Sequence, residues 1–227
     1  MDSGNCFPTL LAADDDSGKL IVRAMNAMGY DALALGTTEV AALPVMRARF
    51  QEVDFPVLSA NVGIRGALPN VQPYLIVEMD GHTIAIVGAT DERIDQLGDQ
   101  VGLPMEVESA VEAVQRTLQE VEERADIVVV LSNLDWQVNE TLAQEVPGID
   151  VIIGASRRRL NEAVTGPEGL VVLQAAGTRG EYLGVLTLGF DGAGRVAAFD
   201  ARHVALTPNY DDDPEIARMI RERGTGP

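Results

Sequence analysis

The chain has 227 residues, which is enough for one sizeable α/β domain and short for two. Its formal net charge is −18 at pH 7, and so acidic a surface is repelled by nucleic-acid phosphates and by anionic membranes. Cys6 is the only cysteine, which excludes an internal disulfide bond and a zinc site built from cysteines.

Short β-branched runs alternate with amphipathic stretches along the chain, which is the pattern of an α/β protein. The first predicted helix covers residues 17–29, with Ser17 as its N-cap and Gly29 as its stop. Two buried strands are predicted after it, at Asp31–Leu35 and at Phe55–Ala60.

A β-hairpin and a long helix are predicted in the middle of the chain. The hairpin pairs Tyr74–Met79 with Thr83–Val87 around Asp80-Gly81, a dipeptide typical of a tight turn. The helix is expected at about residues 106–124, because apolar residues recur there at steps of four and three. The stripe that they form consists of Val107, Val111, Val114, Leu118 and Val121.

The last part of the chain predicts two more buried strands around a short helix, then three antiparallel strands and a final helix. Their expected ranges are Asp126–Leu131, a helix near 137–146, Asp150–Ile153, Leu170–Ala175, Tyr182–Phe190, Arg195–Ala205 and a helix from about Pro214. No repeat or linker breaks this pattern, so we expect a single domain over residues 1–227, with 206–227 as a C-terminal linker and helix.

Four segments, taken in order, resemble the 5'-nucleotidase and cyclic-phosphodiesterase family of calcineurin-like metallophosphoesterases. They are Met25–Ala32 (MNAMGYDA), Phe55–Val62 (FPVLSANV), Gly148–Gly154 (GIDVIIG) and the closing hairpin from Gly180 to Gly194. The resemblance covers roughly residues 1–206. The resemblance implies an α/β fold, namely a four-layer α/β/β/α sandwich. The chain has no counterpart of the family's opening D-x-H strand. Members of such a family hold two metal ions about 3.5–4 Å apart and activate a water for attack on phosphorus.

The positions where the resemblance places metal ligands are substituted in this chain. The family's G-D motif falls on Gly4-Asn5, its G-N-H-E motif on 36–39 (GTTE), its L-S-H motif on 131–133 (LSN) and its G-H-S-H motif on 155–158 (ASRR). We therefore expect a degenerate domain with no metal, no cofactor and no catalytic residue. The residues expected to line the vestigial pocket are Asn5, Thr37, Thr38, Asn133, Ser156, Arg157 and Arg158.

Three hypotheses of function follow from this resemblance. The favoured one is a catalytically inactive protein that acts as a structural or interaction subunit. The alternative is a metal-independent binder of a small anion or nucleotide, because Arg157 and Arg158 could grip a phosphate by paired hydrogen bonds. The third, a residual metal-dependent phosphoesterase that uses Asp2, Glu39 or Asp135, is disfavoured because these positions do not reproduce the family's ligand pattern.

Other reactive side chains are interpreted as structural. A cysteine nucleophile needs a neighbouring base or a lowered pKa, and the matched motifs contain no histidine that could activate Cys6. His82 and His203 fall in a hairpin and in a late strand, away from these motifs.

The missing first strand would leave Asp31–Leu35 with an unpaired sheet edge, and three explanations are open: the chain rearranges there, a partner covers the edge, or the sequence is a fragment of a longer product. We expect a protein partner or a homo-oligomer. No apolar run approaches the length of a membrane span and no signal peptide precedes the first motif. The expectation is a soluble protein without membrane insertion and without a nucleic-acid partner. Its compartment is left open, cytoplasmic by default, although members of the family it resembles are often secreted or periplasmic.

Overall fold

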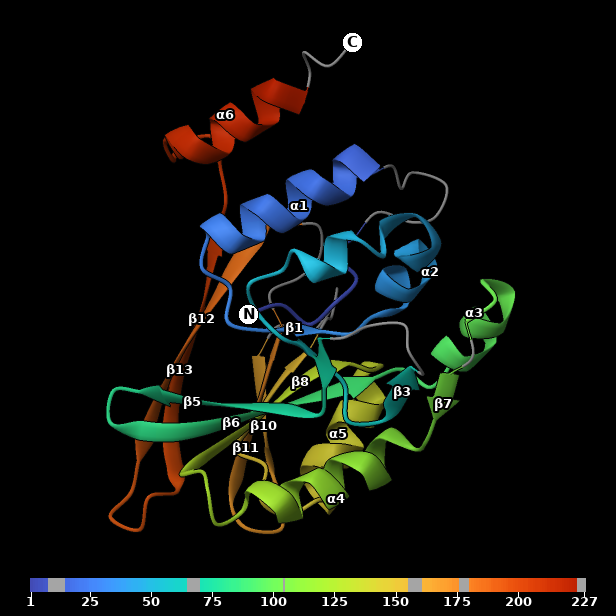
Figure 1. Cartoon of the computed structure of the whole chain (residues 1–227). Helices are drawn as coiled ribbons and strands as arrows, with labels where there is room; N and C mark the ends of the chain where they lie inside the picture. The colour runs from blue at the N-terminus through green and yellow to red at the C-terminus, as the bar shows by residue number, and fades with distance from the viewer. Residues whose placement is uncertain (8–14, 65–69, 104, 155–160, 176–179, 224–227) are drawn as a thin grey trace.

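The computed structural model describes residues 1–7, 15–64, 70–103, 105–154, 161–175 and 180–223. These residues form two packed sheet layers with helices on both outer sides (Figure 1). The predicted α/β/β/α order of the layers is therefore confirmed.

The central layer is a six-stranded sheet in the order β10-β11-β9-β8-β6-β5. Its strands are β5 (Tyr74–Met79), β6 (His82–Thr90), β8 (Ile127–Asn133), β9 (Val151–Gly154), β10 (Asn161–Thr165) and β11 (Leu170–Ala175). The four inner strands run parallel, and the two edge strands β5 and β10 are antiparallel to their neighbours. Every residue of β8 is buried, as a strand covered on both faces requires.

One face of this sheet is covered by α4 (Ala110–Val121) and α5 (Trp136–Glu145). The apolar stripe of α4 is buried there, with Val114 and Val121 fully shielded from solvent. Trp136, the first residue of α5, also packs into this core.

The second sheet layer lies on the opposite face and has two parts. A three-stranded parallel sheet consists of β1 (Leu33–Ala34), β2 (Val57–Leu58) and β4 (Val71–Gln72) in the order β1-β2-β4. A hairpin of β12 (Tyr182–Phe190) and β13 (Val196–Ala205) packs on the same face through Val196 and neighbouring apolar residues.

The two sheets meet closely at Gly88 of β6. A Cβ atom at this position would lie 2.2 Å from the carbonyl carbon of Leu58 in β2, so only glycine fits. This contact brings the carboxyl ends of β1 and β2 against those of β6 and β8, where the candidate site lies.

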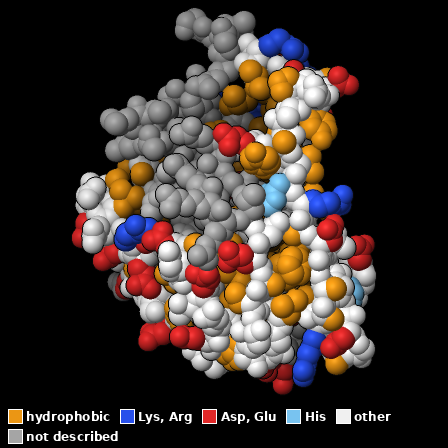
Figure 2. All heavy atoms as spheres, turned by 180° about the vertical axis from the view of Figure 1, so that it is seen from behind, with side chains coloured by type: hydrophobic (Ala, Val, Ile, Leu, Met, Phe, Trp, Pro, Cys, Tyr) orange, Lys and Arg blue, Asp and Glu red, His pale blue; other side chains and the backbone are white. Residues whose placement is uncertain are grey.

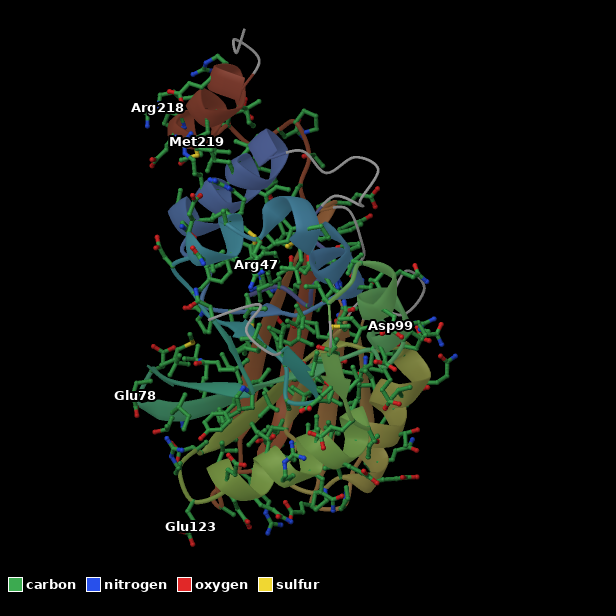
Figure 3. All side chains as sticks on the ribbon, turned by 45° about the vertical axis from the view of Figure 1, so that its right-hand side comes forward. Arg47, Glu78, Asp99, Glu123, Arg218 and Met219 are labelled. Atoms are coloured by element: carbon green, nitrogen blue, oxygen red, sulfur yellow. The ribbon has the colours of Figure 1, made fainter. Side chains whose placement is uncertain are left out.

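The outer helical layer contains α1 (Asp15–Ala27), α2 (Thr37–Met46), η1 (Arg49–Gln51) and α3 (Ile94–Gln100), with a short ribbon of β3 (Val62–Ile64) and β7 (Met105–Val107). The last helix, α6 (Pro214–Arg223), packs against α1. Figure 3 shows Met219 on the side of α6 that faces α1 and Arg218 on the side that faces away. No helix in the described part of the chain is long and apolar enough to cross a membrane.

Three sequence predictions need correction. Ser17 lies inside α1 and does not cap it, although Gly29, with a φ of 67°, follows the helix end as expected. Val107 is not helical, because it pairs with Val62 in the ribbon and α4 begins only at Ala110. Residues 170–175 do not join the closing hairpin, because β11 pairs with β9 and β10 in the other sheet.

The expected open edge at Asp31–Leu35 is also wrong. The strand there is reduced to Leu33–Ala34, and its outer edge is paired by Asp2. The Asp2 N–H donates to the Ala32 carbonyl at 3.0 Å, and the Ala34 N–H donates to the Asp2 carbonyl at 2.9 Å.

Candidate functional site

Four of the predicted site residues meet where the N-terminal segment passes the carboxyl ends of β1 and β8. Asn5 belongs to the N-terminal segment, Thr37 and Thr38 begin α2, and Asn133 ends β8. Gly36 lies among them, and a Cβ atom there would be 2.6 Å from Asn5 Oδ1. Ser156, Arg157 and Arg158 lie outside the described residues.

The side-chain oxygen of Asn5 is fully used within this cluster. It accepts hydrogen bonds from Thr37 Oγ1 and from the Thr38 backbone N–H, both at 3.0 Å. Because a backbone N–H can only donate, the Thr38 contact fixes the orientation of the amide with Oδ1 toward α2. Asn5 has a φ of 63°, a left-handed conformation that asparagine tolerates better than most residues.

The backbone carbonyl of Ser3 fixes the orientation of the Asn133 amide. Asn133 Nδ2 donates to this carbonyl at 2.8 Å, and a carbonyl can only accept. Asn133 Oδ1 therefore faces Asn5 and accepts from Asn5 Nδ2 at 3.4 Å. The two amides form a neutral, internally satisfied network where the resemblance places charged and imidazole metal ligands.

Glu39 is fully buried beneath this network and holds the N-terminal segment in place. Its Oε2 accepts from the Asn5 N–H at 2.8 Å, and its Oε1 accepts from the N–H groups of Cys6 and Phe7 at 2.9 and 3.0 Å. Burial raises the pKa of the Glu39 carboxyl, and hydrogen bonds from the Phe7 and Asn5 N–H groups and from the Cys6 thiol only partly oppose that effect. Glu39 is thus turned toward the backbone and occupied by it.

Cys6 is held as a protonated thiol. Its Sγ lies 3.4 Å from Glu39 Oε1. Burial, reinforced by the nearby Glu39 carboxylate, raises the pKa of Cys6 well above its usual range. A nucleophilic cysteine needs the opposite shift, which supports the interpretation of Cys6 as a structural residue.

The carboxylates of the third hypothesis point to separate places. Asp2 Oδ1 accepts from the Gly4 N–H at 2.9 Å, and burial raises the pKa of Asp2. Asp135 is exposed and lies 3.3 Å from Arg93. Across the described ranges, no group of three or more His, Cys, Asp or Glu side chains is arranged to hold a metal ion.

Arg93 is a feature of the site's rim that the sequence did not reveal. Thr90 and Asn133 are register partners in β6 and β8, so the residues that follow them, Asp91 and Asp135, lie at the same sheet edge. Arg93 Nε donates to both oxygens of Asp91 at 2.8 and 2.9 Å and lowers the pKa of that carboxyl. No motif points to this arginine, since only the register of two strands far apart in sequence brings its partners together.

The two histidines take structural positions, as predicted. The His82 ring lies 5.2 Å from the Phe190 ring, between β6 and the closing hairpin. His203 Nε2 lies 2.5 Å from the Ala175 carbonyl, between β13 and β11.

The described residues do not fit the two metal ions that such a fold implies. Asn5, Thr37 and Asn133 bring neutral amides and a hydroxyl to the site, and both amide oxygens already accept hydrogen bonds within the network. The Glu39 carboxylate lies beside them, but it already accepts from the Thr38 hydroxyl and from three backbone N–H groups. An amide oxygen also binds a dication more weakly than a carboxylate or an imidazole does, because it contributes no charge and is a poorer donor.

Comparisons with known proteins identify the type of domain. The chain is 26% identical over 247 residues to 5'-nucleotidase of Bos taurus, with 98% of this chain and 43% of the relative covered. It is 26% identical over 263 residues to the trifunctional nucleotide phosphoesterase YfkN of Bacillus subtilis, with 97% of this chain and 18% of the relative covered. The chain thus spans less than half the length of these relatives. No protein-family model matches it.

Solved structures show the same fold. A 5'-nucleotidase precursor from Thermus thermophilus superimposes with a TM-score of 0.85 at 24% identity, covering 98% of this chain and 48% of that one. The calcineurin-like phosphoesterase YfkN from Bacillus subtilis gives a TM-score of 0.72 at 22% identity, covering 93% and 75%. The chain therefore has the fold of the calcineurin-like phosphoesterases.

Within that class, the sequence relatives and the structural neighbours include 5'-nucleotidases. The chain carries a domain of the 5'-nucleotidase type, as its motifs predicted.

Proposed function

We propose that this 5'-nucleotidase-type domain is catalytically inactive and acts as a structural or interaction subunit. The observation that carries the proposal is the Asn5–Asn133 network, whose amide orientations are each fixed by a backbone group. For a dication to bind, both amides would have to break these bonds, and the Glu39 carboxylate beside them already accepts from three backbone N–H groups.

The position of Glu39 supports the same proposal. It is the one acidic member of the four motifs, and its carboxylate is bound to three backbone N–H groups of residues 5–7. Its role is to hold the N-terminal segment against α2. Glu39 thus stabilises the fold, and the side chains of Asn5, Thr37 and Asn133 near it are neutral.

The proposal is tested by calorimetric titration of the purified chain with Mn²⁺. The wild type is expected to give no saturable heat. A variant with Asn5→Asp, Thr37→Asn and Asn133→His restores the ligand types of the resemblance and is expected to bind Mn²⁺ measurably more tightly. Asn209→Asp, an exposed position away from the site, adds the same negative charge and is expected to behave as wild type.

Saturable, stoichiometric binding by the wild type would contradict the proposal. A folded triple variant that still fails to bind would show that these three substitutions are not what separates the domain from metal binding.

A further inference from the structure

A cavity lies at the end of the central sheet opposite the candidate site. Its volume is about 680 Å³, a size typical of sites for small molecules. Helix α4 lines one side, and the segments that lead into β8, β9 and β11 line the others, together with the turn between β12 and β13. Because β8 begins at this cavity and ends at Asn133, the two sites occupy opposite ends of the sheet. Both α4 and the β12–β13 turn lie at the bottom of Figure 1, away from the N-terminal segment.

The buried part of the cavity lining is apolar. It consists of Leu118, Val128, Val146, Ile149, Val171 and Val196, each less than a tenth exposed. Such a lining stabilises a bound hydrocarbon group, because it removes that group from water.

Four carboxylates surround this apolar lining, each on a different segment of the chain. They are Glu122 of α4, Asp126 before β8, Asp150 before β9 and Glu168 in the turn before β11. Across the described ranges, none of the four forms an ion pair. The lining contains one basic residue, Arg195, which shares its turn with the oppositely charged Asp191.

Asp150 reaches furthest into this cavity lining, since it is half-buried while the other three acidic residues are exposed. Its Oδ2 accepts from the Val128 N–H at 2.8 Å. Burial raises the pKa of the Asp150 carboxyl, the Val128 N–H opposes this effect, and the nearby Glu168 charge adds to it. An ammonium group beside Asp150 and Glu168 would remove the repulsion between them.

The arrangement of these charges selects one kind of cation. In the part of the chain that the structure describes, no three acidic, histidine or cysteine side chains are gathered to hold a metal ion. The carboxylates are instead distributed around an apolar lining, which suits a molecule whose ammonium groups are separated by hydrocarbon.

We propose that this cavity binds a linear polyamine, with its ammonium groups at the carboxylates and its methylene groups against the apolar lining. The site does not depend on the loss of metal chemistry proposed above, because it lies at the other end of the sheet.

The general charge of the molecule has to be separated from such a site. Figure 2 shows acidic side chains spread over the described part of the back of the molecule, with few basic ones among them. A chain with a net charge of −18 attracts any polycation. That attraction depends on charge alone and is largely screened at about 0.15 M salt, whereas a built site also distinguishes the shape of the cation.

The test is calorimetric titration of the full chain with spermidine, a linear triamine, in about 0.15 M NaCl. The wild type is expected to bind it saturably with one-to-one stoichiometry. Hexaamminecobalt(III) is a compact cation of the same charge without methylene groups, and it is expected to bind at least about tenfold more weakly.

Charge-neutralising variants locate the binding. Asp150→Asn keeps an acceptor for the Val128 N–H and is expected to weaken spermidine binding about tenfold. Glu168→Gln lies in an exposed turn and is expected to weaken it about threefold, which keeps the test valid should Asp150→Asn fail to fold. Asp211→Asn removes the same charge from an exposed position outside the cavity and is expected to leave the affinity unchanged. Circular dichroism checks that each variant is folded.

A wild type without saturable spermidine binding would overturn this site, as would equal affinity for hexaamminecobalt(III) or an equal loss of affinity in Asp211→Asn and Glu168→Gln. The Mn²⁺ titration reports on the other end of the sheet. A chain that binds neither Mn²⁺ nor spermidine would therefore end the polyamine proposal and leave the loss of metal chemistry standing.

Discussion

At the level of single residues, the carboxyl groups of Asp2 and Glu39, whose pKa burial raises, contribute to how the stability of this domain responds to pH. Burial raises the pKa of both above their ordinary values of 3.8 and 4.5. The protonated carboxyl groups of Asp2 and Glu39 are therefore favoured more in the folded state than in the unfolded state. The stability that they contribute is fully present below those ordinary values and is lost as the pH rises through the higher folded pKa. Asp91, whose pKa Arg93 lowers, acts in the opposite sense and loses its contribution as the pH falls.

Asp2→Asn is expected to stabilise the domain at neutral pH and to flatten this dependence. The amide oxygen can still accept from the Gly4 N–H, but no charge has to be buried. Urea unfolding between about pH 5 and pH 8 measures the slope. Asp211→Asn removes the same charge from an exposed position and serves as the control. An equal effect of both variants would assign the dependence to net charge and not to burial.

Glu39→Gln is expected to lower the free energy of unfolding by about 1–3 kcal/mol, because the new NH₂ group would face a backbone N–H that now has an acceptor. Glu123, which projects into solvent in Figure 3, gives the matched control Glu123→Gln, expected to change stability by less than about 0.5 kcal/mol. Denaturant unfolding of both variants decides the matter, and equal midpoints would refute the role given to Glu39.

At the level of elements, the packing of β2 against β6 depends on the absence of a side chain at Gly88. Gly88→Ala is expected to destabilise the fold by about 1–3 kcal/mol or more, since a methyl group would collide with the Leu58 backbone. Gly192→Ala is the control, because a Cβ atom in that turn meets nothing within 4 Å. Thermal unfolding of both proteins checks the prediction, and a Gly88→Ala variant as stable as Gly192→Ala would contradict this account of the interface.

Elements whose signal lies within a short stretch of sequence could be predicted from the sequence. The apolar run of β8 and the turn at Asp80-Gly81, whose φ values are 51° and 82°, carry their own signals. Helix α2 does not, because it is apolar on all sides and contains Pro44. The sequence also favoured a helix at Val107, whose partner in β3 lies far upstream and cannot be read from local periodicity.

The same distinction applies to the site. Asn5, Thr37, Thr38 and Asn133 could be assigned from motif positions, and the structure brings them together. The orientation of the amides and the attachment of Glu39 to residues 5–7 depend on backbone groups of other segments, so no pattern of residue types predicts them.

At the level of the whole molecule, the net charge of −18 opposes compaction. Addition of NaCl screens this repulsion, so the thermal midpoint is expected to rise between low salt and about 0.15 M, where the Debye length is about 8 Å. Differential scanning calorimetry measures the shift. A midpoint that does not rise would show that paired charges, such as Arg116 with Glu108, already balance the repulsion.

The measurement that tests the central claim most directly is metal content together with phosphatase activity of the purified protein. The chain would be assayed with excess Mn²⁺ or Zn²⁺ and a generic phosphate ester, and its bound metal quantified after desalting. We predict no retained metal and no turnover above the protein-free rate. Stoichiometric metal together with turnover that a chelator abolishes would contradict the account and establish the domain as an active phosphoesterase with a different ligand set.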